Sequence, residues 1–282
     1  MEDIGYRLGR FDLINHHAYC GGLVMKYYST EKINYVNAVE LIDVSFAYDS
    51  NPVLNHLHLI VPNRQRIGII GPNGAGKSTL LTLLNGVLRT EDEIKICNYI
   101  INRKNKKIIK SLVGLVFQNP DDQLFSPTLL DDVMFGPLNM GIPPQQAKQR
   151  SREVLRTIGL EGFEHRSSIH LSFGERKLAA IATVLSMTPE IIALDEPTSN
   201  LDALHRRKII KWLQNQEKTV LITSHDLDMI YETCHRVIIL YKGQVVADGQ
   251  VSDILTNGAL LEQYDLERPL AFQQTRHINQ NS

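Results

Sequence analysis

The stretch Gly71–Thr79, GPNGAGKST, constrains the fold of this chain more than any other part of its sequence. It meets every fixed position of G-x-x-x-x-G-K-[ST], follows a short apolar run and precedes a segment with a helical pattern. Glycines let the backbone wrap closely, so several N–H groups converge on phosphates at the positive end of the helix. In such a loop Lys77 supplies a charge for the β- and γ-phosphates, and the Ser78 hydroxyl can bind Mg²⁺. The sequence therefore predicts a nucleotide site formed by Gly71, Pro72, Asn73, Gly74, Ala75, Gly76, Lys77, Ser78 and Thr79.

Strand and helix patterns alternate around this loop. Residues 39–48 and 53–62 both alternate like strands, and the DSNP turn between them predicts an antiparallel hairpin. Farther along, EIIALDEP and TVLITSH have the pattern of buried strands, with helical patterns before, between and after them. A Pro- and Gly-bearing region from about residue 120 to 144 interrupts this alternation. The order predicts an α/β fold with a mostly parallel sheet and crossover helices.

Composition narrows the class of protein. With 282 residues, 43% of them hydrophobic and 22% charged, the chain is typical of globular proteins. The net charge of −1 gives no global reason to expect a nucleic-acid partner. No stretch approaches the roughly 18 apolar residues that span a bilayer, and the acidic start lacks the apolar core of a signal peptide. The 3 cysteines favour free thiols in a reducing compartment, so we expect a cytoplasmic location.

Two further motifs carry chemistry. IIALDEP ends an apolar strand with two carboxylates, and a strand end can direct Asp195 toward Mg²⁺ and Glu196 toward an attacking water as its general base. LSFGERK contains Ser172-x-x-Glu175, which is a capping box and so predicts a helix start. An exposed helix N-terminus is also an anion site, and this one makes sense if it meets a nucleotide bound to another subunit.

The order of the motifs is more specific than any one of them. The chain presents GPNGAGKST, VFQNPDDQLF, LSFGERK, IIALDEP, SNLD and TSHD in sequence. Over residues 39–250 this set resembles the ATP-binding-cassette (ABC) ATPases. The resemblance implies a P-loop NTPase with a RecA-like, mostly parallel sheet covered by helices on both faces. It also implies an antiparallel β subdomain and a helical signature subdomain at about residues 120–186. Residues 1–38 are then an N-terminal extension, and residues 251–282 a C-terminal tail with a helix.

The resemblance also implies roles for single residues. Gln118 and His225 join Glu196 as catalytic groups, because Gln118 senses Mg²⁺ and the γ-phosphate and His225 contacts the γ-phosphate. Tyr48 stacks on the adenine of ATP, and Asp202 lies at a dimer interface. The Mg²⁺ ligands implied are Ser78, Gln118 and Asp195. In the head-to-tail dimer of the family, the ATP held by Lys77 of one subunit is closed over by Ser172, Gly174 and Glu175 of the other.

The stretch VFQNPDDQLF, residues 116–125, and the LSFGE signature are similar to those of cobalt, nickel and vitamin importers of the energy-coupling-factor group. In the family this loop receives a coupling helix of an integral membrane subunit. We expect Asp121 and Asp122 to meet arginines of that helix, and Leu124 and Phe125 to form an apolar floor. The resemblance implies membrane transport and substrate-binding subunits, a second ABC ATPase subunit, no nucleic acid, and a peripheral location on the cytoplasmic side of the cell membrane.

Other functions stay open at this point. Uptake of cobalt or nickel leads, uptake of a vitamin by the same group is second, and the catalytic motifs do not exclude an efflux pump. A soluble cassette ATPase of DNA repair or chromosome organisation is disfavoured, because the segment from Lys77 to Leu171 carries prolines and no sustained heptads.

The chain departs from the family pattern at several positions. The signature has Phe173 and Glu175 where Gly and Gln are commonest, and Glu175 near a triphosphate would weaken closure. Asn200 replaces the usual alanine of the SALD-type loop. Arg64 stands where a turn glycine is common, and we expect Asn63 beside it to take the left-handed conformation. None of these changes removes a catalytic group, so activity is expected.

Two groups of residues could suggest a metal site. His56 and His58 share a strand face but have no third ligand at a suitable spacing, so we interpret them as exposed strand residues. The NHHAYC stretch at residues 15–20 lies outside the family match and is also not expected to bind metal. Residues 1–24 are expected to be dispensable, because Met25 precedes the matched region.

Overall fold

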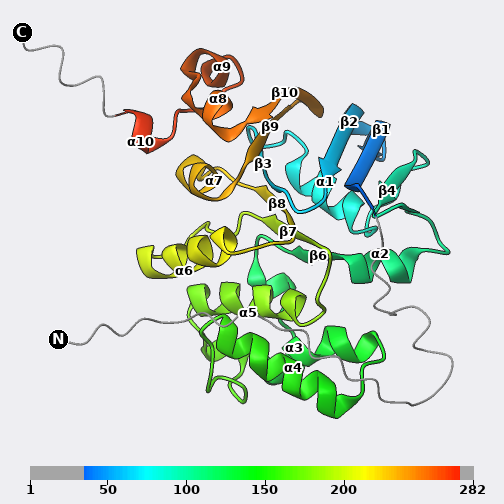
Figure 1. Ribbon diagram of the computed structural model, residues 1–282, viewed down its shortest axis with the longest axis vertical. Coiled ribbons are helices and arrows are strands. Elements are labelled where there is room, and N and C mark those ends of the chain that lie inside the picture. Colours follow the sequence, from blue (N-terminus) through cyan, green and yellow to red (C-terminus); the bar gives the residue numbers. More distant parts are fainter. Residues whose placement is uncertain (1–34, 274–282) are drawn as a thin grey trace, which may run out of the picture. The chain divides into compact units, whose positions relative to one another are not determined.

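The computed structural model describes residues 35–273, which form two sheets with helices around them (Figure 1). The first sheet has four strands in the order β2-β1-β4-β5, and the second has six in the order β10-β9-β3-β8-β7-β6. The stretch at residues 15–20 and Met25 lie outside the described residues. The strands are β1 Asn37–Tyr48, β2 Asn51–Pro62, β3 Arg66–Ile70, β4 Ile94–Ile96, β5 Tyr99–Ile100, β6 Val113–Val116, β7 Ile191–Asp195, β8 Thr219–Thr223, β9 Arg236–Tyr241 and β10 Gln244–Gln250.

The four-stranded sheet is antiparallel and begins with the hairpin that the sequence predicts. β1 pairs with β2 across the turn at residues 49 and 50, although bulges shift the register at several points. β1 begins at Asn37, ahead of the expected boundary at residue 39. The turn after β2 corrects one expectation: Arg64 itself takes the left-handed conformation, with φ of 59°, and Asn63 does not. The backbone N–H of Arg64 donates to the hydroxyl of Thr219 at 2.9 Å, which offsets part of the strain.

The six-stranded sheet confirms the predicted parallel arrangement. β3 pairs in parallel with both β8 and β9, β7 pairs in parallel with β6 and β8, and only β10 runs antiparallel. Along β7, Ile192 and Leu194 belong to one hydrophobic core and Ile191 and Ala193 to the other. Both faces of this sheet are therefore buried, as an α/β fold requires.

Helices, together with the antiparallel sheet, cover the two faces of the six-stranded sheet. Figure 1 shows α6 and α7 on one side of the six-stranded sheet, and α1 with the antiparallel sheet on the other. Among the described residues, no helix combines the length and apolar character needed to cross a bilayer. The helices are α1 Lys77–Leu84, α2 Lys106–Leu112, α3 Leu129–Asn139, α4 Pro144–Thr157, α5 Phe173–Leu185, α6 Ala203–Gln214, α7 Leu227–Thr233, α8 Val251–Thr256, α9 Gly258–Gln263 and α10 Leu270–Gln273, with short 3₁₀ turns η2 Pro120–Asp122 and η3 Ser168–His170.

One helix, α3, lies inside the Pro- and Gly-bearing region that showed no regular pattern. Thr128 caps its start by accepting a hydrogen bond from the backbone N–H of Asp131. Pro137 lies near its end and cannot donate to the carbonyl of Val133. The hydroxyl of Ser186 donates to that carbonyl instead, at 2.8 Å, so a contact distant in sequence makes the proline tolerable.

Candidate active site

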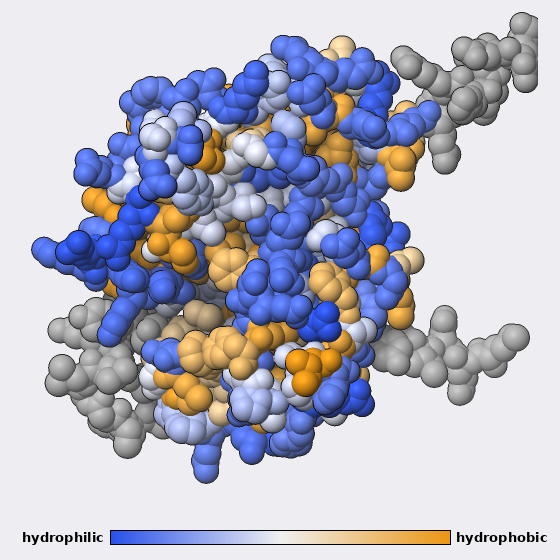
Figure 2. Space-filling model, turned by 180° about the vertical axis from the view of Figure 1, so that it is seen from behind, coloured by the Kyte–Doolittle hydropathy of each residue, from blue (hydrophilic) through white to orange (hydrophobic). Residues whose placement is uncertain are grey.

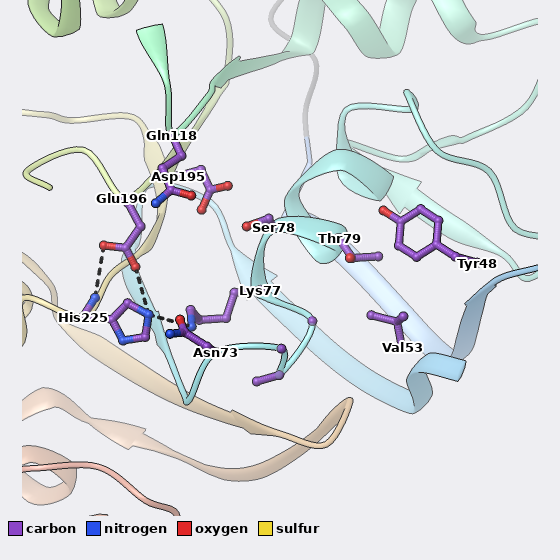
Figure 3. Close-up of a pocket in the computed structure, with 13 residues that line it drawn as sticks. Tyr48, Val53, Asn73, Lys77, Ser78, Thr79, Gln118, Asp195, Glu196 and His225 are labelled. Atoms are coloured by element: carbon purple, nitrogen blue, oxygen red, sulfur yellow. Dashed lines mark hydrogen bonds and ion pairs between the residues drawn. The ribbon is translucent and has the colours of Figure 1, made fainter. Parts of the chain in front are cut away.

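A pocket of about 340 Å³ opens at the carboxyl ends of β3, β7 and β8 (Figure 3). Figure 3 shows Gln118, Asp195, Glu196 and His225 around Lys77 and Ser78, with Tyr48 and Val53 at the opposite end. All of the residues predicted to hold the nucleotide and Mg²⁺ within one subunit, apart from Gly71 and Pro72, line this pocket. The lining consists of Tyr48, Val53, Asn73, Gly74, Ala75, Gly76, Lys77, Ser78, Thr79, Gln118, Asp195, Glu196 and His225.

The loop between β3 and α1 needs glycine at two points. Gly76 is the N-cap residue of α1 and has φ of 102°, which residues with a side chain rarely adopt. A Cβ added to Gly71 would lie 2.0 Å from the carbonyl oxygen of Leu240. Gly71 and Gly76 thus allow the loop to wrap closely before α1, whose first N–H groups can donate to an anion in the pocket.

Lys77 is only 7% exposed. Its ammonium donates to the carbonyls of Gly71 and Pro72, at 2.8 and 3.0 Å, and lies 3.3 Å from Nε2 of His225. Burial lowers the pKa of Lys77, and the nearby carboxylates of Glu196 and Asp195 oppose that effect. The ammonium is thus held at the pocket by weak neutral acceptors, and a phosphate could replace them.

Asp195 ends β7, and Glu196 follows it in a left-handed conformation with φ of 46°. The hydroxyl of Thr223, on neighbouring β8, donates to Oδ1 of Asp195 at 2.5 Å. Oε2 of Glu196 accepts from the backbone N–H of His225 at 3.2 Å. Burial raises the pKa of Glu196, an effect opposed by that hydrogen bond and by the charge of Lys77. A buried carboxylate with a raised pKa, in a strained backbone beside a lysine, has the chemistry of a general base.

One oxygen of this carboxylate is left without a partner. Oε1 of Glu196 is buried and accepts no hydrogen bond from any residue between 35 and 273, although Nε2 of His225 lies 3.6 Å away. An orphaned buried oxygen aimed into a pocket costs free energy unless a ligand or water satisfies it. The His225 ring is half exposed at the pocket edge, where it can reach a bound group.

The pocket also fits Mg²⁺. Ser78 offers a hydroxyl, Gln118 an amide oxygen and Asp195 a carboxylate, and all three line the same pocket. Hard oxygen ligands of this kind, few in number, are what Mg²⁺ uses when phosphates and waters complete its shell. The metal ligands predicted from the sequence are therefore brought together, while their role stays a proposal. Among the described residues, no group of three or more His, Cys, Asp or Glu side chains could hold a metal ion on its own.

The signature residues lie elsewhere. Ser172 is the N-cap residue of α5, and neither it nor Gly174 or Glu175 lines the pocket of its own chain. The predicted capping box is present: the backbone N–H of Ser172 donates to Oε2 of Glu175 at 2.7 Å, and the N–H of Glu175 donates to Oγ of Ser172 at 3.2 Å. Gly174 packs against the ring of His205, which a Cβ would approach to 2.4 Å.

The loop after Gln118 qualifies two predictions. Asp121, expected to meet an arginine of another protein, already pairs with Arg176 of this chain at 3.0 Å. Leu124 is 7% exposed and belongs to the core, so only Phe125, at 67% exposed, can form an apolar surface. Phe125 stacks edge to face on Phe135 of α3, with ring centres 4.9 Å apart. The loop is thus an ordered part of the fold with one aromatic pair at its surface.

Other predicted residues have mainly local partners. Asp202 caps α6 by accepting from the backbone N–H of His205 at 2.9 Å, and its carboxylate lies 2.7 Å from Nδ1 of that ring. His56 and His58 are exposed, as expected, and both approach the carboxylate of Asp43, at 2.6 and 3.9 Å. Neither feature reaches the pocket.

Comparison with known proteins places this geometry in a family. Residues 54–199 match the sequence model of the ABC transporter family. The chain belongs to that family. It is 40% identical, over 82% of its length and 85% of the relative's, to the energy-coupling factor transporter ATP-binding protein EcfA of Methanocaldococcus jannaschii. It is 44% identical, over 83% and 88%, to the EcfA of Carboxydothermus hydrogenoformans.

Solved structures agree with the sequence relatives. The structure of cbiO1 from Clostridium perfringens, described as part of the ABC transporter complex cbiONQ, superposes with a TM-score of 0.71 and 30% identity. It covers 80% of this chain and 94% of cbiO1. A dimeric ATP-binding cassette bound to ADP and Pi gives a TM-score of 0.67 at 27% identity, covering 76% of this chain and 98% of that one. The α/β P-loop fold and the class of ABC-type ATPase, both implied by the motifs, are confirmed.

Sequence reasoning missed several residues of this site. Val53 lines the pocket because the β1–β2 hairpin brings it opposite the phosphate loop, and no motif marks it. Thr223 orients Asp195 through its hydroxyl, and its place as the first residue of TSHD, at the end of a buried strand, was the available signal. Lys177 of α5 is completely buried, although a lysine in the first turns of a capped helix is expected to be exposed.

Proposed function

We propose that this ABC ATPase is the energising subunit of an importer of the energy-coupling-factor group, attached to the cytoplasmic side of the cell membrane. The names of the relatives support the group. The observation that carries the proposal is the surface just beyond Gln118. There Phe125, on the loop that begins at Gln118 in the pocket, forms an exposed aromatic pair with Phe135 of α3.

The aromatic pair suits a helix of a membrane subunit. Phe125 is 67% and Phe135 50% exposed, and Leu138 of the same helix is 41% exposed. Figure 2 shows hydrophobic groups among hydrophilic ones over the lower part of the molecule, as on the rest of this face. Asp122 forms no ion pair with any described residue and is available to an arginine of the incoming helix, whereas Asp121 would exchange or share its contact with Arg176. Exposed aromatic residues rimmed by charge are typical of docking sites.

In the proposed reaction, the backbone N–H groups of the loop and the ammonium of Lys77 bind the phosphates of ATP. Tyr48, which is 46% exposed and already stacked edge to face on Phe46, receives the adenine. Mg²⁺, held by Ser78, Gln118 and Asp195, would neutralise charge on the phosphates. Glu196 accepts the proton of the attacking water, and its orphaned Oε1 is the atom placed to do so. His225 contacts the γ-phosphate from the edge.

The proposal includes a second cassette. Ser172 is exposed at the N-terminus of α5, Glu175 beside it is partly exposed, and neither lines the pocket of its own chain, which holds Lys77. Closing one chain's α5 onto the other chain's pocket would complete both sites. The partner is either another copy or a sister ATPase.

The cargo is proposed to be cobalt or nickel ions, on the strength of the QNPDDQLF string. The alternative is a vitamin carried by the same group, and a separate membrane subunit would select it. Uptake of labelled Co²⁺, Ni²⁺ and vitamins into vesicles that contain the complex discriminates between them.

The test of the function is purification of the tagged chain from solubilised native membranes. We expect a multi-span membrane subunit with arginine-bearing cytoplasmic helices to be recovered. Phe125→Asp should lose it while ATP hydrolysis by the isolated chain persists. Ile60→Asp is the matched control, since Ile60 is 50% exposed on strand β2. Recovery of only soluble or nucleic-acid partners would contradict the importer.

A further inference from the structure

Lys177 is the unusual residue of α5. It is 0% exposed, the most buried charged side chain in the described part of the chain, and it lies on the helix that begins with the signature. Its ammonium donates to the backbone carbonyl of Gln118 at 2.5 Å. Burial lowers its pKa to about 8, with the carboxylates of Asp195 and Glu196 acting in the opposite direction. A buried ammonium is costly, so its position requires an explanation.

The contact from Lys177 is made to Gln118, the residue of this loop that lines the pocket. The exposed side chain of Gln118 lines the pocket, and the carbonyl of the same residue is held by Lys177. The position of this peptide fixes the point from which the Gln118 side chain extends, and so limits the places that its amide can reach through its χ angles. Lys177 thus fixes the backbone from which a proposed Mg²⁺ ligand extends.

A second residue holds the other side of the same loop. Oε1 of Gln123 accepts from the backbone N–H of Phe117, at 3.1 Å. Its amide nitrogen donates to the carbonyl of Ala180 at 2.9 Å and to the hydroxyl of Thr183 at 2.7 Å, both on α5. Gln123 therefore ties the residue before Gln118 to the same helix.

A third tie is the ion pair between Asp121 and Arg176, the neighbour of Lys177 on α5. The Asp121 side chain is 59% exposed and that of Arg176 is 21% exposed, so this ion pair adds little to stability alone. Together the three ties join residues 117–123 to α5 along its first turns. The loop that leads to the exposed aromatic pair and the helix that begins with the signature are connected at Gln118.

We propose that Lys177 and Gln123 are positioning residues, which hold the backbone of residues 117 and 118 against α5 and so keep the Gln118 side chain at the pocket. This inference deepens the proposed function and rests on the role given there to Gln118.

The test compares two buried lysines. Lys177→Met removes the tie to Gln118 and keeps an unbranched side chain of similar length. Lys218→Met is the matched control, because Lys218 is also largely buried and its ammonium also donates to a backbone carbonyl, that of Pro189. Lys218 precedes β8, at the end of the sheet opposite to the pocket. Both variants lose a lysine charge and one hydrogen bond to a backbone carbonyl, and thermal melting of each shows how far a loss of stability alone accounts for the change in binding.

The readout is the dissociation constant of a fluorescent, non-hydrolysable ATP analogue, measured with Mg²⁺ and with EDTA. Partners that orient a metal ligand typically change metal affinity about 10–100-fold. Mg²⁺ should tighten binding of the analogue about tenfold less in Lys177→Met than in the wild type. The dissociation constant measured in EDTA should change little. Lys218→Met should keep the wild-type ratio. Gln123→Met should show the same loss as Lys177→Met, and it provides the test if Lys177→Met does not fold.

A double variant tests whether Lys177 acts on Mg²⁺-dependent binding through Gln118. In a Gln118→Ala background, Lys177→Met should lower the Mg²⁺ effect no further, because both changes act through one side chain. An unchanged ratio in Lys177→Met and Gln123→Met, or an undiminished additional loss in the double variant, overturns the positioning role. If Gln118→Ala itself leaves the Mg²⁺ effect intact, the proposed role of Gln118 fails first, and this inference fails with it.

Discussion

The pocket beside Lys77 and the first turn of α5 are both marked by short motifs, but their groups are satisfied to very different degrees. In the pocket, Glu196 has a left-handed backbone and an orphaned oxygen, and burial lowers the pKa of Lys77. At α5, Ser172 and Glu175 satisfy each other in a complete capping box. The comparison indicates that the pocket is maintained at a cost to stability, whereas the signature turn stabilises the fold before any ligand arrives.

The largest expected effect is on turnover. Glu196→Gln removes the proposed general base while keeping the shape of the side chain, so ATP hydrolysis should fall by at least about 100-fold. ATP binding should persist. Glu190→Gln is the control, because Glu190 precedes the same strand at its other end, where the Tyr35 hydroxyl donates to it at 3.1 Å. Phosphate release measures the rate, and wild-type turnover in Glu196→Gln would remove Glu196 from the mechanism.

The next effect is on binding. Lys77→Met should weaken ATP binding about 10–100-fold, since a charge-assisted contact to phosphate is worth about 1.5–3 kcal/mol. The melting temperature should stay the same or rise, because burial disfavours the charged form that the variant removes. Calorimetry measures both quantities. A marked loss of stability would mean that Lys77 supports the fold as much as the ligand, and the contrast with α5 would disappear.

The opposite pattern is expected at α5. Ser172→Ala removes the N-cap hydrogen bond and should cost about 1 kcal/mol in the free energy of unfolding, whereas Ser172→Gly should cost only a few tenths. ATP binding by the isolated chain should not change, because Ser172 does not line its pocket. Urea unfolding and nucleotide titration provide the two measurements. Loss of binding at unchanged stability would place Ser172 in the pocket of its own chain.

The smallest expected effect is on the pH dependence of stability, through Glu175 at the start of α5. Hydrogen bonds from the backbone N–H and hydroxyl of Ser172 lower the pKa of Glu175, more than burial raises it. A carboxylate with a depressed pKa contributes stability above its unfolded pKa, and that contribution is lost as the pH falls through the folded pKa. Glu175→Gln keeps an acceptor for the capping box but cannot titrate, so its stability should depend less on pH in the acidic range. Equal slopes for the two proteins would exclude this linkage.

The sequence predicted features that local patterns determine. The phosphate loop requires a strand before it and a helix after it, and the capping box requires only residues within one turn. The features it missed depend on contacts between distant segments. Helix α3 tolerates Pro137 because Ser186 supplies a hydroxyl from α5's end, Asp121 is engaged by Arg176, and Lys177 is buried by packing that no periodicity reveals. The left-handed Arg64 likewise depends on Thr219.

The most direct test of the central claim is the mass of the Glu196→Gln chain in solution by light scattering. It should be measured without nucleotide and at saturating ATP, alone and mixed with any second cassette recovered from the membranes. If the pocket of one chain is completed by α5 of another, ATP should double the mass in one of these samples, and a charged residue at Ser172 should prevent it. A mass that stays monomeric in every sample would contradict the composite site.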